Sequence, residues 1–212
     1  MNASDPSSVN RPAGWTREHE TRWATAIWPR LKKVEGGYVD HAKDRGGATK
    51  YGISLRFLAI EGKIDLDQDG LADFDLNRDG RIDALDVRLL TPAICEALYL
   101  RLFMIETGFW SLPRPFDAAL FDLGVNVGTG TAVKILQRAL NRFGPPMLKV
   151  DAGLGPKTIR TLEIVSGEGR QVLSAVRAEA EAYYRAIVAN DAGQRVFLNG
   201  WLARAGELGR VA

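Results

Sequence analysis

Apolar residues recur at helical spacing along most of the chain. In the first such segment, residues 15–34, they fall at intervals of four, four and three and form one stripe, made of Trp23, Ile27, Leu31 and Val34. This pattern predicts an amphipathic helix. Thr16 stands where an N-cap is expected, and Gly36-Gly37 supplies a stop signal.

Beyond this helix, the polar segment 38–54 with its glycines predicts an irregular β-hairpin or small sheet. Helical patterns then start near Ser54, at Pro92 and near Pro156, and they also cover residues 116–126, 131–143, 168–190 and 194–206. The predicted fold is therefore mainly α (α+β), with a small β-hairpin after the first helix.

The composition is that of a soluble globular protein, with 46% hydrophobic and 25% charged residues among 212. Charges interrupt every apolar stretch before it is long enough to span a bilayer, so we expect no stable membrane insertion. Residues 1–14 are polar and lack the order of a signal peptide, which predicts a flexible tail. Cys95 lies alone in an apolar-periodic run, which favours a buried thiol.

The net charge of +2 hides an uneven distribution. Residues 65–86 carry a local charge of −6, so the rest of the chain carries +8. A basic body suits an anionic polymer such as a bacterial envelope. Nucleic acid is also anionic, but the sequence has no basic run interleaved with aromatic residues, so we expect no nucleic-acid partner.

The segment 75–86, DLNRDGRIDALD, has the spacing of an EF-hand calcium loop. Gly80 fills the sixth position, where the loop turns sharply, and aspartate replaces the usual glutamate at the twelfth, as in dockerin loops. The expected ligands are Asp75, Asn77, Asp79, the Arg81 carbonyl, Asp83 and Asp86. A solvated acidic loop without metal is the alternative.

A second such loop begins ten residues earlier, with Asp65, Asp67 and Asp69 ahead of Gly70 and with Asp73 at the ninth position. Its twelfth position is occupied by Leu76, so this loop is either incomplete or shares Asp75 with its neighbour. So many aspartates repel one another in the absence of a cation. We therefore expect calcium to order this segment and to act structurally.

Glu35 directly follows the first predicted helix. The carboxyl end of a helix carries partial negative charge, which tends to raise the pKa of a nearby carboxyl group. A carboxyl group that remains protonated near neutral pH suits the general acid of glycoside hydrolysis. By itself, this position fits an incidental surface glutamate at least as well.

The residues around Glu35 favour the general acid over the incidental surface glutamate. The segment continues as Glu35-Gly36-Gly37-Tyr38, then Asp44, Gly46-Gly47, Thr49 and Gly52-Ile53-Ser54. It resembles the signature of glycoside hydrolase family 108, N-acetylmuramidases of phages and bacterial secretion loci. It is also similar to the phage-type lysozyme arrangement of glutamate, aspartate and threonine, although four residues rather than five separate Asp44 from Thr49.

The resemblance implies a lysozyme-like fold and hydrolysis of the β-1,4 bond between N-acetylmuramic acid and N-acetylglucosamine. Glu35 would protonate the glycosidic oxygen, Asp44 would orient a water or stabilise the transition state, and the Thr49 hydroxyl would hold that water. Tyr38 and Tyr51 would either flank the sugar rings or pack the hairpin.

The resemblance continues downstream, where residues 116–144, 150–162 and 197–208 look like the predicted peptidoglycan domain that accompanies this family. Asn126 would contact glycan N-acetyl groups or serve in a cap or turn. We expect a flexible tail (1–14), a catalytic lobe (15–115) that carries the calcium-loop insert (62–91), and a helical lobe (116–212) packed on it. Calcium would then order a wall of the cleft.

Three functions stay open. They are a hydrolytic muramidase of the endolysin type, a lytic transglycosylase, and a non-enzymatic calcium-dependent wall-binding or secretion-helper protein. Asp44 and Thr49 favour the hydrolase, because a transglycosylase needs no positioned water. We expect a monomer with calcium as cofactor, held in the host cytoplasm until a holin-type pore releases it to the peptidoglycan of the periplasm and cell wall.

Overall fold

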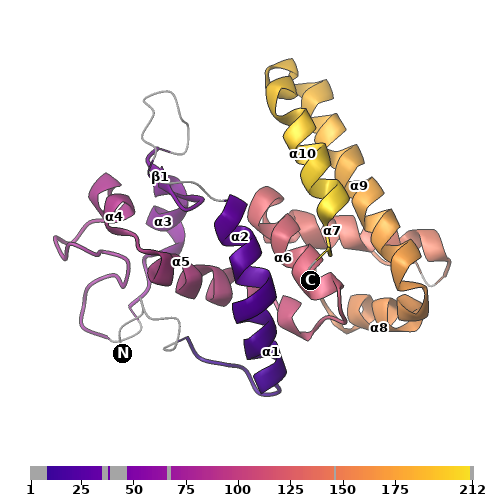
Figure 1. Cartoon of the computed structure of the whole chain (residues 1–212), viewed down its shortest axis with the longest axis horizontal. Coiled ribbons are helices and arrows are strands. Elements are labelled where there is room, and N and C mark those ends of the chain that lie inside the picture. Colours follow the sequence, from indigo (N-terminus) through magenta and orange to yellow (C-terminus); the bar gives the residue numbers. More distant parts are fainter. Residues whose placement is uncertain (1–8, 35–37, 39–46, 66–67, 146, 211–212) are drawn as a thin grey trace. The chain divides into compact units, whose positions relative to one another are not determined.

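The computed structural model describes residues 9–34, 38, 47–65, 68–145 and 147–210. The chain forms two compact units, Met1–Ile105 and Glu106–Ala212. Both units are built mainly of helices, and the first also holds a small antiparallel sheet (Figure 1). The predicted mainly α fold with a β-hairpin after the first helix is confirmed.

The first predicted helix consists of three consecutive helical segments, α1 (Arg17–Arg22), η2 (Trp23–Ile27) and α2 (Trp28–Val34). Thr16 is the N-cap as expected, and its backbone N–H donates to His19 Nδ1 at 3.0 Å. Trp23, Ile27 and Leu31 of the apolar stripe are buried. The central segment η2 is a π-helix, a widening that the apolar pattern did not predict. Pro29 follows directly and has no N–H to continue the regular ladder.

The hairpin pairs β1 (Thr49–Lys50) with β2 (Ile53–Ser54), with Thr49 opposite Ser54 and Lys50 opposite Ile53. Its two turn residues, Tyr51 and Gly52, both have positive φ, 50° and 76°. Such angles are typical of the tight turns that match the twist of paired strands. Ser54 then caps α3 (Leu55–Glu61) by accepting a hydrogen bond from the Phe57 N–H, so the predicted helix start is confirmed.

Two more helical segments complete the first unit. They are α4 (Ala84–Leu89) and α5 (Pro92–Tyr99), which continues as the π-helical η3 (Leu100–Ile105). The Thr91 hydroxyl caps α5 and Pro92 begins it, as predicted. Cys95 is fully buried, which confirms the buried thiol, and burial raises the pKa of this thiol to about 12.

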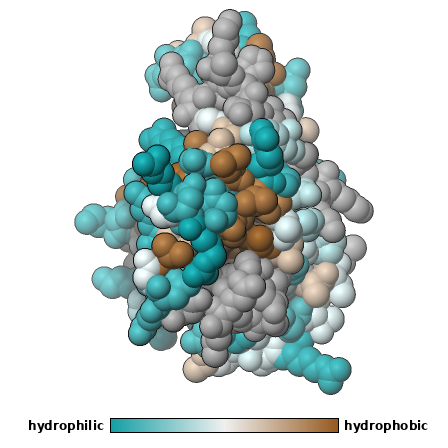
Figure 2. Space-filling model, turned by 90° about the vertical axis from the view of Figure 1, so that its left-hand side faces the viewer, coloured by the Kyte–Doolittle hydropathy of each residue, from teal (hydrophilic) through white to brown (hydrophobic). Residues whose placement is uncertain are grey.

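The face shown in Figure 2 carries a patch of hydrophobic surface between hydrophilic residues. In the described part of the first unit, the exposed large apolar side chains are those of Ile60, Leu85 and Leu89.

The second unit is entirely helical in the part that the structure describes. Its elements are η4 (Phe109–Ser111), α6 (Phe116–Val127), α7 (Thr129–Leu140), η5 (Asn141–Phe143), α8 (Pro156–Val165), η6 (Ser166–Glu168), α9 (Gly169–Asn190), η7 (Ala192–Gln194) and α10 (Arg195–Glu207). Helix α6 is buried along most of its length and packs on α7. Helix α9 packs on both α7 and α10, which runs back along it (Figure 1). The helices predicted for this half of the chain are confirmed.

Candidate functional site

The three predicted catalytic residues follow the first helical segment. Glu35 and Asp44 lie outside the residues that the structure describes, and Thr49 opens strand β1. The Thr49 hydroxyl is half-buried and lies 3.4 Å from the Gly47 carbonyl oxygen. This is a long contact, so the hydroxyl has capacity left to bind a water or a ligand.

Both tyrosines proposed as sugar contacts pack against cations of the first unit. The Tyr51 ring centroid lies 5.6 Å from Lys50 Nζ, and the Tyr51 carbonyl accepts a hydrogen bond from the Tyr99 hydroxyl at 3.1 Å. The Tyr38 ring centroid lies 5.1 Å from Arg88 Cζ. These cation–π contacts account for a packing role in and near the hairpin. A substrate-binding role of the two rings stays a prediction.

Asn126 lies in the second unit, in the last turn of α6, and is half-buried. The left-handed turn that ends α6 is made by Gly128, with φ of 85°, and the Gly128 N–H donates to the Gly124 carbonyl. Among the described residues, the Asn126 side chain has no hydrogen-bond partner, so its amide does not act as a cap there. A ligand-contact role of Asn126 stays a prediction.

The loop 75–86 has the backbone arrangement that an EF-hand position-one aspartate produces. The buried Asp75 carboxylate accepts the N–H of Asp79 at 3.1 Å and of Gly80 at 2.6 Å. Gly80 has φ of 85°, as the sharp turn at the sixth position requires. The Asp79 carboxylate accepts the Arg81 N–H at 3.0 Å. The donor types and the turn therefore fit the predicted calcium loop.

The first aspartate loop repeats this local geometry ten residues earlier. The Asp65 carboxylate accepts the N–H of Asp69 at 3.1 Å and of Gly70 at 3.0 Å. Gly70 has φ of 86°, and the Asp69 carboxylate accepts the Leu71 N–H. The Arg78 guanidinium joins the two loops through an ion pair of 2.8 Å with Asp69. Asp67, another predicted ligand, lies outside the described residues.

The last two predicted ligands also have a role in the fold. Asp83 caps α4, and the fully buried Asp86 carboxylate accepts a hydrogen bond from the Asp83 N–H at 2.7 Å. Asp86 also accepts the N–H groups of Leu76 and Asn77. Within the part of the chain that the structure describes, no three histidine, cysteine or carboxylate side chains converge as ligands of one ion. A metal role for these residues stays a prediction.

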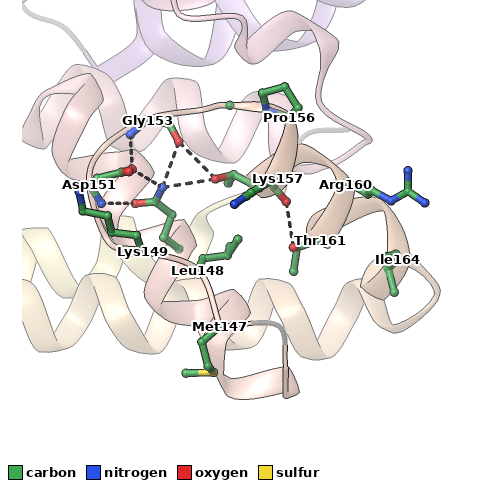
Figure 3. Close-up of a pocket in the computed structure, with 13 residues that line it drawn as sticks. Met147, Leu148, Lys149, Asp151, Gly153, Pro156, Lys157, Arg160, Thr161 and Ile164 are labelled. Carbon is green, nitrogen blue, oxygen red and sulfur yellow. Dashed lines mark hydrogen bonds between the residues drawn. The ribbon is translucent and has the colours of Figure 1, made fainter.

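The second unit contains a pocket of about 870 Å³ between α8 and the segment 147–155 (Figure 3). Two side-chain amides, those of Gln137 in α7 and of Asn141 at the start of η5, hold that segment. Asn141 donates to the Leu148 carbonyl at 2.9 Å and accepts the Leu148 N–H at 2.6 Å. Gln137 accepts the N–H groups of Asp151 and Ala152 at 3.0 and 3.2 Å. One wall of the pocket is therefore a loop fastened at two points.

Gln137 is also the centre of the polar floor, with only 1% of its surface exposed. Its Nε2 lies 3.0 Å from the Asp151 carboxylate, 3.0 Å from the Gly153 carbonyl and 3.3 Å from the Thr158 hydroxyl. The hydrogen bond from Gln137, followed by that from the Gly153 N–H, holds the pKa of Asp151 below its usual value. Asp151 is therefore a fixed carboxylate inside this network.

This pocket was not predicted from the sequence, although the sequence contains a signal for it. Gln137 occupies a position one turn after Val133 on the buried face of α7, where an apolar residue is expected. A buried glutamine needs partners for its amide. The turn-forming segment after Val150 supplies them.

Each half of the chain matches a known protein family. Residues 29–128 match the family model described as glycosyl hydrolase 108. The chain carries a glycoside hydrolase domain. Residues 131–206 match the model described as a predicted peptidoglycan domain. With these two matches, the protein is a glycoside hydrolase that acts on peptidoglycan. This finding argues against the non-enzymatic alternative. The pocket at Gln137 lies inside the matched peptidoglycan domain.

The fold of the glycosyl hydrolase 108 segment and its partner domain also occurs in a solved structure. "Structure of Brucella abortus SagA" aligns with a TM-score of 0.62 and 23% identity, over 90% of this chain and 97% of that one. No curated protein matches the sequence. No helix among the described residues combines the length and the apolar composition needed to cross a bilayer.

Proposed function

We propose that the protein is an N-acetylmuramidase that hydrolyses the β-1,4 bond between N-acetylmuramic acid and N-acetylglucosamine. The observation that carries this proposal is the glycosyl hydrolase 108 match over residues 29–128, because it spans Glu35, Asp44 and Thr49. These residues would supply the two carboxyl groups that hydrolysis of a glycosidic bond uses and a hydroxyl able to hold the water.

In the proposed reaction, Glu35 donates its proton to the glycosidic oxygen as the bond to the sugar C1 breaks. Asp44 orients the attacking water or stabilises the positive charge that develops on the ring. Thr49 accepts a hydrogen bond from that water. Its half-buried position in β1 and its long contact with Gly47 are compatible with this role.

The test of the acid is Glu35→Gln, which keeps the size of the side chain and removes its proton. We expect turnover on purified peptidoglycan to fall by about 10²- to 10⁴-fold, the usual contribution of a general acid. The matched control is Glu61→Gln, an exposed glutamate at the end of α3, which should keep full activity. Unchanged turnover in the Glu35 variant would remove the proposed acid.

The nature of the product separates hydrolysis from the lytic transglycosylase alternative. Digestion in H₂¹⁸O should place one ¹⁸O atom at the reducing end of each N-acetylmuramic acid released, because water attacks C1. A transglycosylase would instead release 1,6-anhydro ends without ¹⁸O. Mass spectrometry of the soluble fragments distinguishes the two products. Anhydro ends as the main product would contradict the hydrolase.

We also propose that the loop 75–86 binds calcium and that the ion is structural. The buried Asp75 and Asp86 carboxylates, the exposed Asp79 and the left-handed Gly80 support this assignment. Calcium would neutralise neighbouring carboxylates and hold the loop between α3 and α4, whereas the chemistry would remain with Glu35 and Asp44. The related loop at residues 65–73 is a second candidate, supported by its matching turn.

The proposed cellular setting is that of an endolysin. A monomer would be held in the host cytoplasm until a holin-type pore gives it access to the cell wall. This proposal rests on the similarity of the Glu35 segment to phage-type lysozymes. Light scattering of the purified protein tests the monomer, and lysis of cells that express it with and without a holin tests the route of release.

A further inference from the structure

The neutral polar groups in the pocket of the second unit are already used inside the protein. The Gln137 amide is bound on both sides, and the Thr158 hydroxyl donates to the Gly153 carbonyl at 3.2 Å. The Thr161 hydroxyl donates to the Lys157 carbonyl at 2.9 Å. An uncharged sugar strand gains most from side chains held ready to donate and accept hydrogen bonds, and the neutral groups of this lining are already used. The lining is therefore poorly suited to a bare glycan strand.

Three cations in the lining remain available to a ligand. Lys149, Lys157 and Arg160 are exposed, and none of them forms an ion pair within the part of the chain that the structure describes. Lys157 extends from the first turn of α8 toward the segment that carries Leu148, and Arg160 lies further along the same helix (Figure 3). Asp151 offsets one of these charges but is fixed by Gln137 and Gly153. The pocket therefore favours anions.

The other available surface is apolar. Met147 and Ile164 are 65% and 70% exposed at the pocket, which is a large fraction for side chains of this kind. Leu148 and Pro156 also line the pocket (Figure 3). The volume of about 870 Å³ lies in the range of small-ligand sites. A short peptide with free carboxylates and small apolar side chains complements both the charge and the apolar surface.

We propose that this pocket binds the carboxylate-bearing stem peptide of peptidoglycan, and not its glycan strand. The stem peptides combine alanine methyl groups with free carboxylates, so they offer the chemistry that the lining selects. The inference rests on the proposed function for its choice of polymer. The second unit would then bind the peptides while the first unit cleaves the sugar chain.

The test is sedimentation of the full chain with insoluble sacculi, in a Glu35→Gln background that limits digestion. One preparation of sacculi is intact and the other has been stripped of stem peptides by an amidase. The pocket variant replaces Lys149, Lys157 and Arg160 by glutamine. The control variant removes the same charge from exposed sites that do not line the pocket, Lys134, Arg185 and Arg195.

We expect the pocket variant to bind intact sacculi at least about tenfold more weakly than the control variant, since three exposed ionic contacts are lost. The protein with the unsubstituted pocket should bind stripped sacculi as weakly as the pocket variant binds intact sacculi. Three results would overturn the inference. These are equal binding by the two variants, equal binding to intact and stripped sacculi, and no binding to either.

A second pair of variants tests the apolar part of the pocket. Ile164→Gln should weaken binding to intact sacculi several-fold, whereas Val196→Gln, which changes a residue 79% exposed on α10, should not. Equal effects of the two substitutions would count against the apolar contact. Both sites are exposed, so neither substitution should change the melting temperature.

Failure of this inference can be told apart from failure of the proposed function. With Glu35 intact, the pocket variant should cleave peptide-free glycan oligomers at the unsubstituted rate, because the acid lies elsewhere. If Glu35→Gln still cleaves these oligomers, the proposed acid is wrong and the sacculus binding result is unaffected. If cleavage needs Glu35 but sacculi bind without regard to peptides, only the pocket assignment falls.

Discussion

At the scale of single residues, the hydroxyl of Thr49 and the amide of Gln137 have different roles. Thr49 makes one long contact with Gly47, and its side chain remains able to bind water. Gln137 is almost fully buried, and its amide makes close contacts on both sides. The first side chain is a candidate for chemistry, and the second organises its surroundings.

The role of Thr49 is tested by the pair Thr49→Val and Thr49→Ser. Valine has nearly the same shape and suits a strand, but it lacks the hydroxyl. We expect kcat of the valine variant to fall by about tenfold or more, the size of one lost hydrogen bond to the reacting water. The serine variant should recover most of the rate. Equal rates for valine and serine would show that the hydroxyl takes no part.

Replacing Gln137 by leucine should loosen the pocket wall. The substitution leaves the N–H groups of Asp151 and Ala152 without their acceptor, which costs about 1–3 kcal/mol per group left unsatisfied. Urea unfolding should show a loss of this size. Gln171→Leu, at an exposed position of α9, is the control and should stay within about 0.5 kcal/mol of the wild type.

The same variant should change how stability depends on pH. The folded pKa of Asp151 lies below its ordinary value of 3.8, mainly because of the bond from Gln137. Its contribution to stability is therefore present above pH 3.8 and is lost as the pH falls through the folded value. In Gln137→Leu, the Asp151 pKa measured by NMR should rise toward 3.8. An unchanged pKa would mean that the other contacts of Asp151, with the Gly153 N–H and the nearby Lys149 charge, account for the shift.

At the scale of elements, the aspartate-rich segment is a pair of similar turns. Gln68 and Arg78 have φ of 58° and 60°, and each is followed two residues later by a left-handed glycine, Gly70 or Gly80. In each turn, one aspartate binds two backbone N–H groups. The aspartates of the two turns lie close together along the chain, and their mutual repulsion is expected to make the segment sensitive to cations.

Calcium is therefore expected to raise the melting temperature of the protein, because it binds the folded loop and not the unfolded chain. With free calcium at about a hundredfold excess over its dissociation constant, the stabilisation is about 2.7 kcal/mol, which calorimetry detects easily. A chelator should reverse it. Asp79→Asn keeps an oxygen for the Arg81 N–H but loses the charge, so it should lower the calcium effect. An unchanged midpoint with calcium and with chelator would contradict the proposal.

At the scale of the whole molecule, each unit has its own core and its own candidate function. The core of the first unit contains Trp23, Leu58, Cys95 and Met104, all nearly inaccessible to solvent. The core of the second unit is formed around α6, with α7 against α9 and α9 against α10. A thiol buried in one core is a natural reporter of whether that unit is folded.

Cys95 should react with a thiol reagent only when the first unit opens. It is fully buried, and its pKa of about 12 keeps it protonated at pH 8, whereas the thiolate is the reactive form. We expect labelling at least about a hundredfold slower than in urea. A chain with an added Ala182→Cys, at an exposed position of α9, should show one fast and one slow thiol. Two fast thiols in the native protein would contradict the buried environment.

The sequence by itself determined what depends on short stretches of chain. The helix from Thr16 onward, the caps at Ser54 and Thr91, and the proline starts at Pro92 and Pro156 all follow from residues within a turn of each other. The signature around Glu35 and the spacing of the aspartate loops are equally local. Neighbouring residues fix the backbone conformation of such caps and helix starts, which can therefore be predicted without the fold.

Only the tertiary structure decided what depends on contacts between distant segments. The pocket exists because Gln137 of α7 and Asn141 of η5 bind a loop that follows seven to sixteen residues later, and because α8 folds back against it. The cations of that loop and of α8 acquire a common function only once they line the same cavity. Packing also brought the indole N–H of Trp23 to the half-buried Glu96 carboxylate, which lies 73 residues away in the chain. Such pairings depend on how segments meet in space, and no local pattern of hydrophobic and polar residues encodes that.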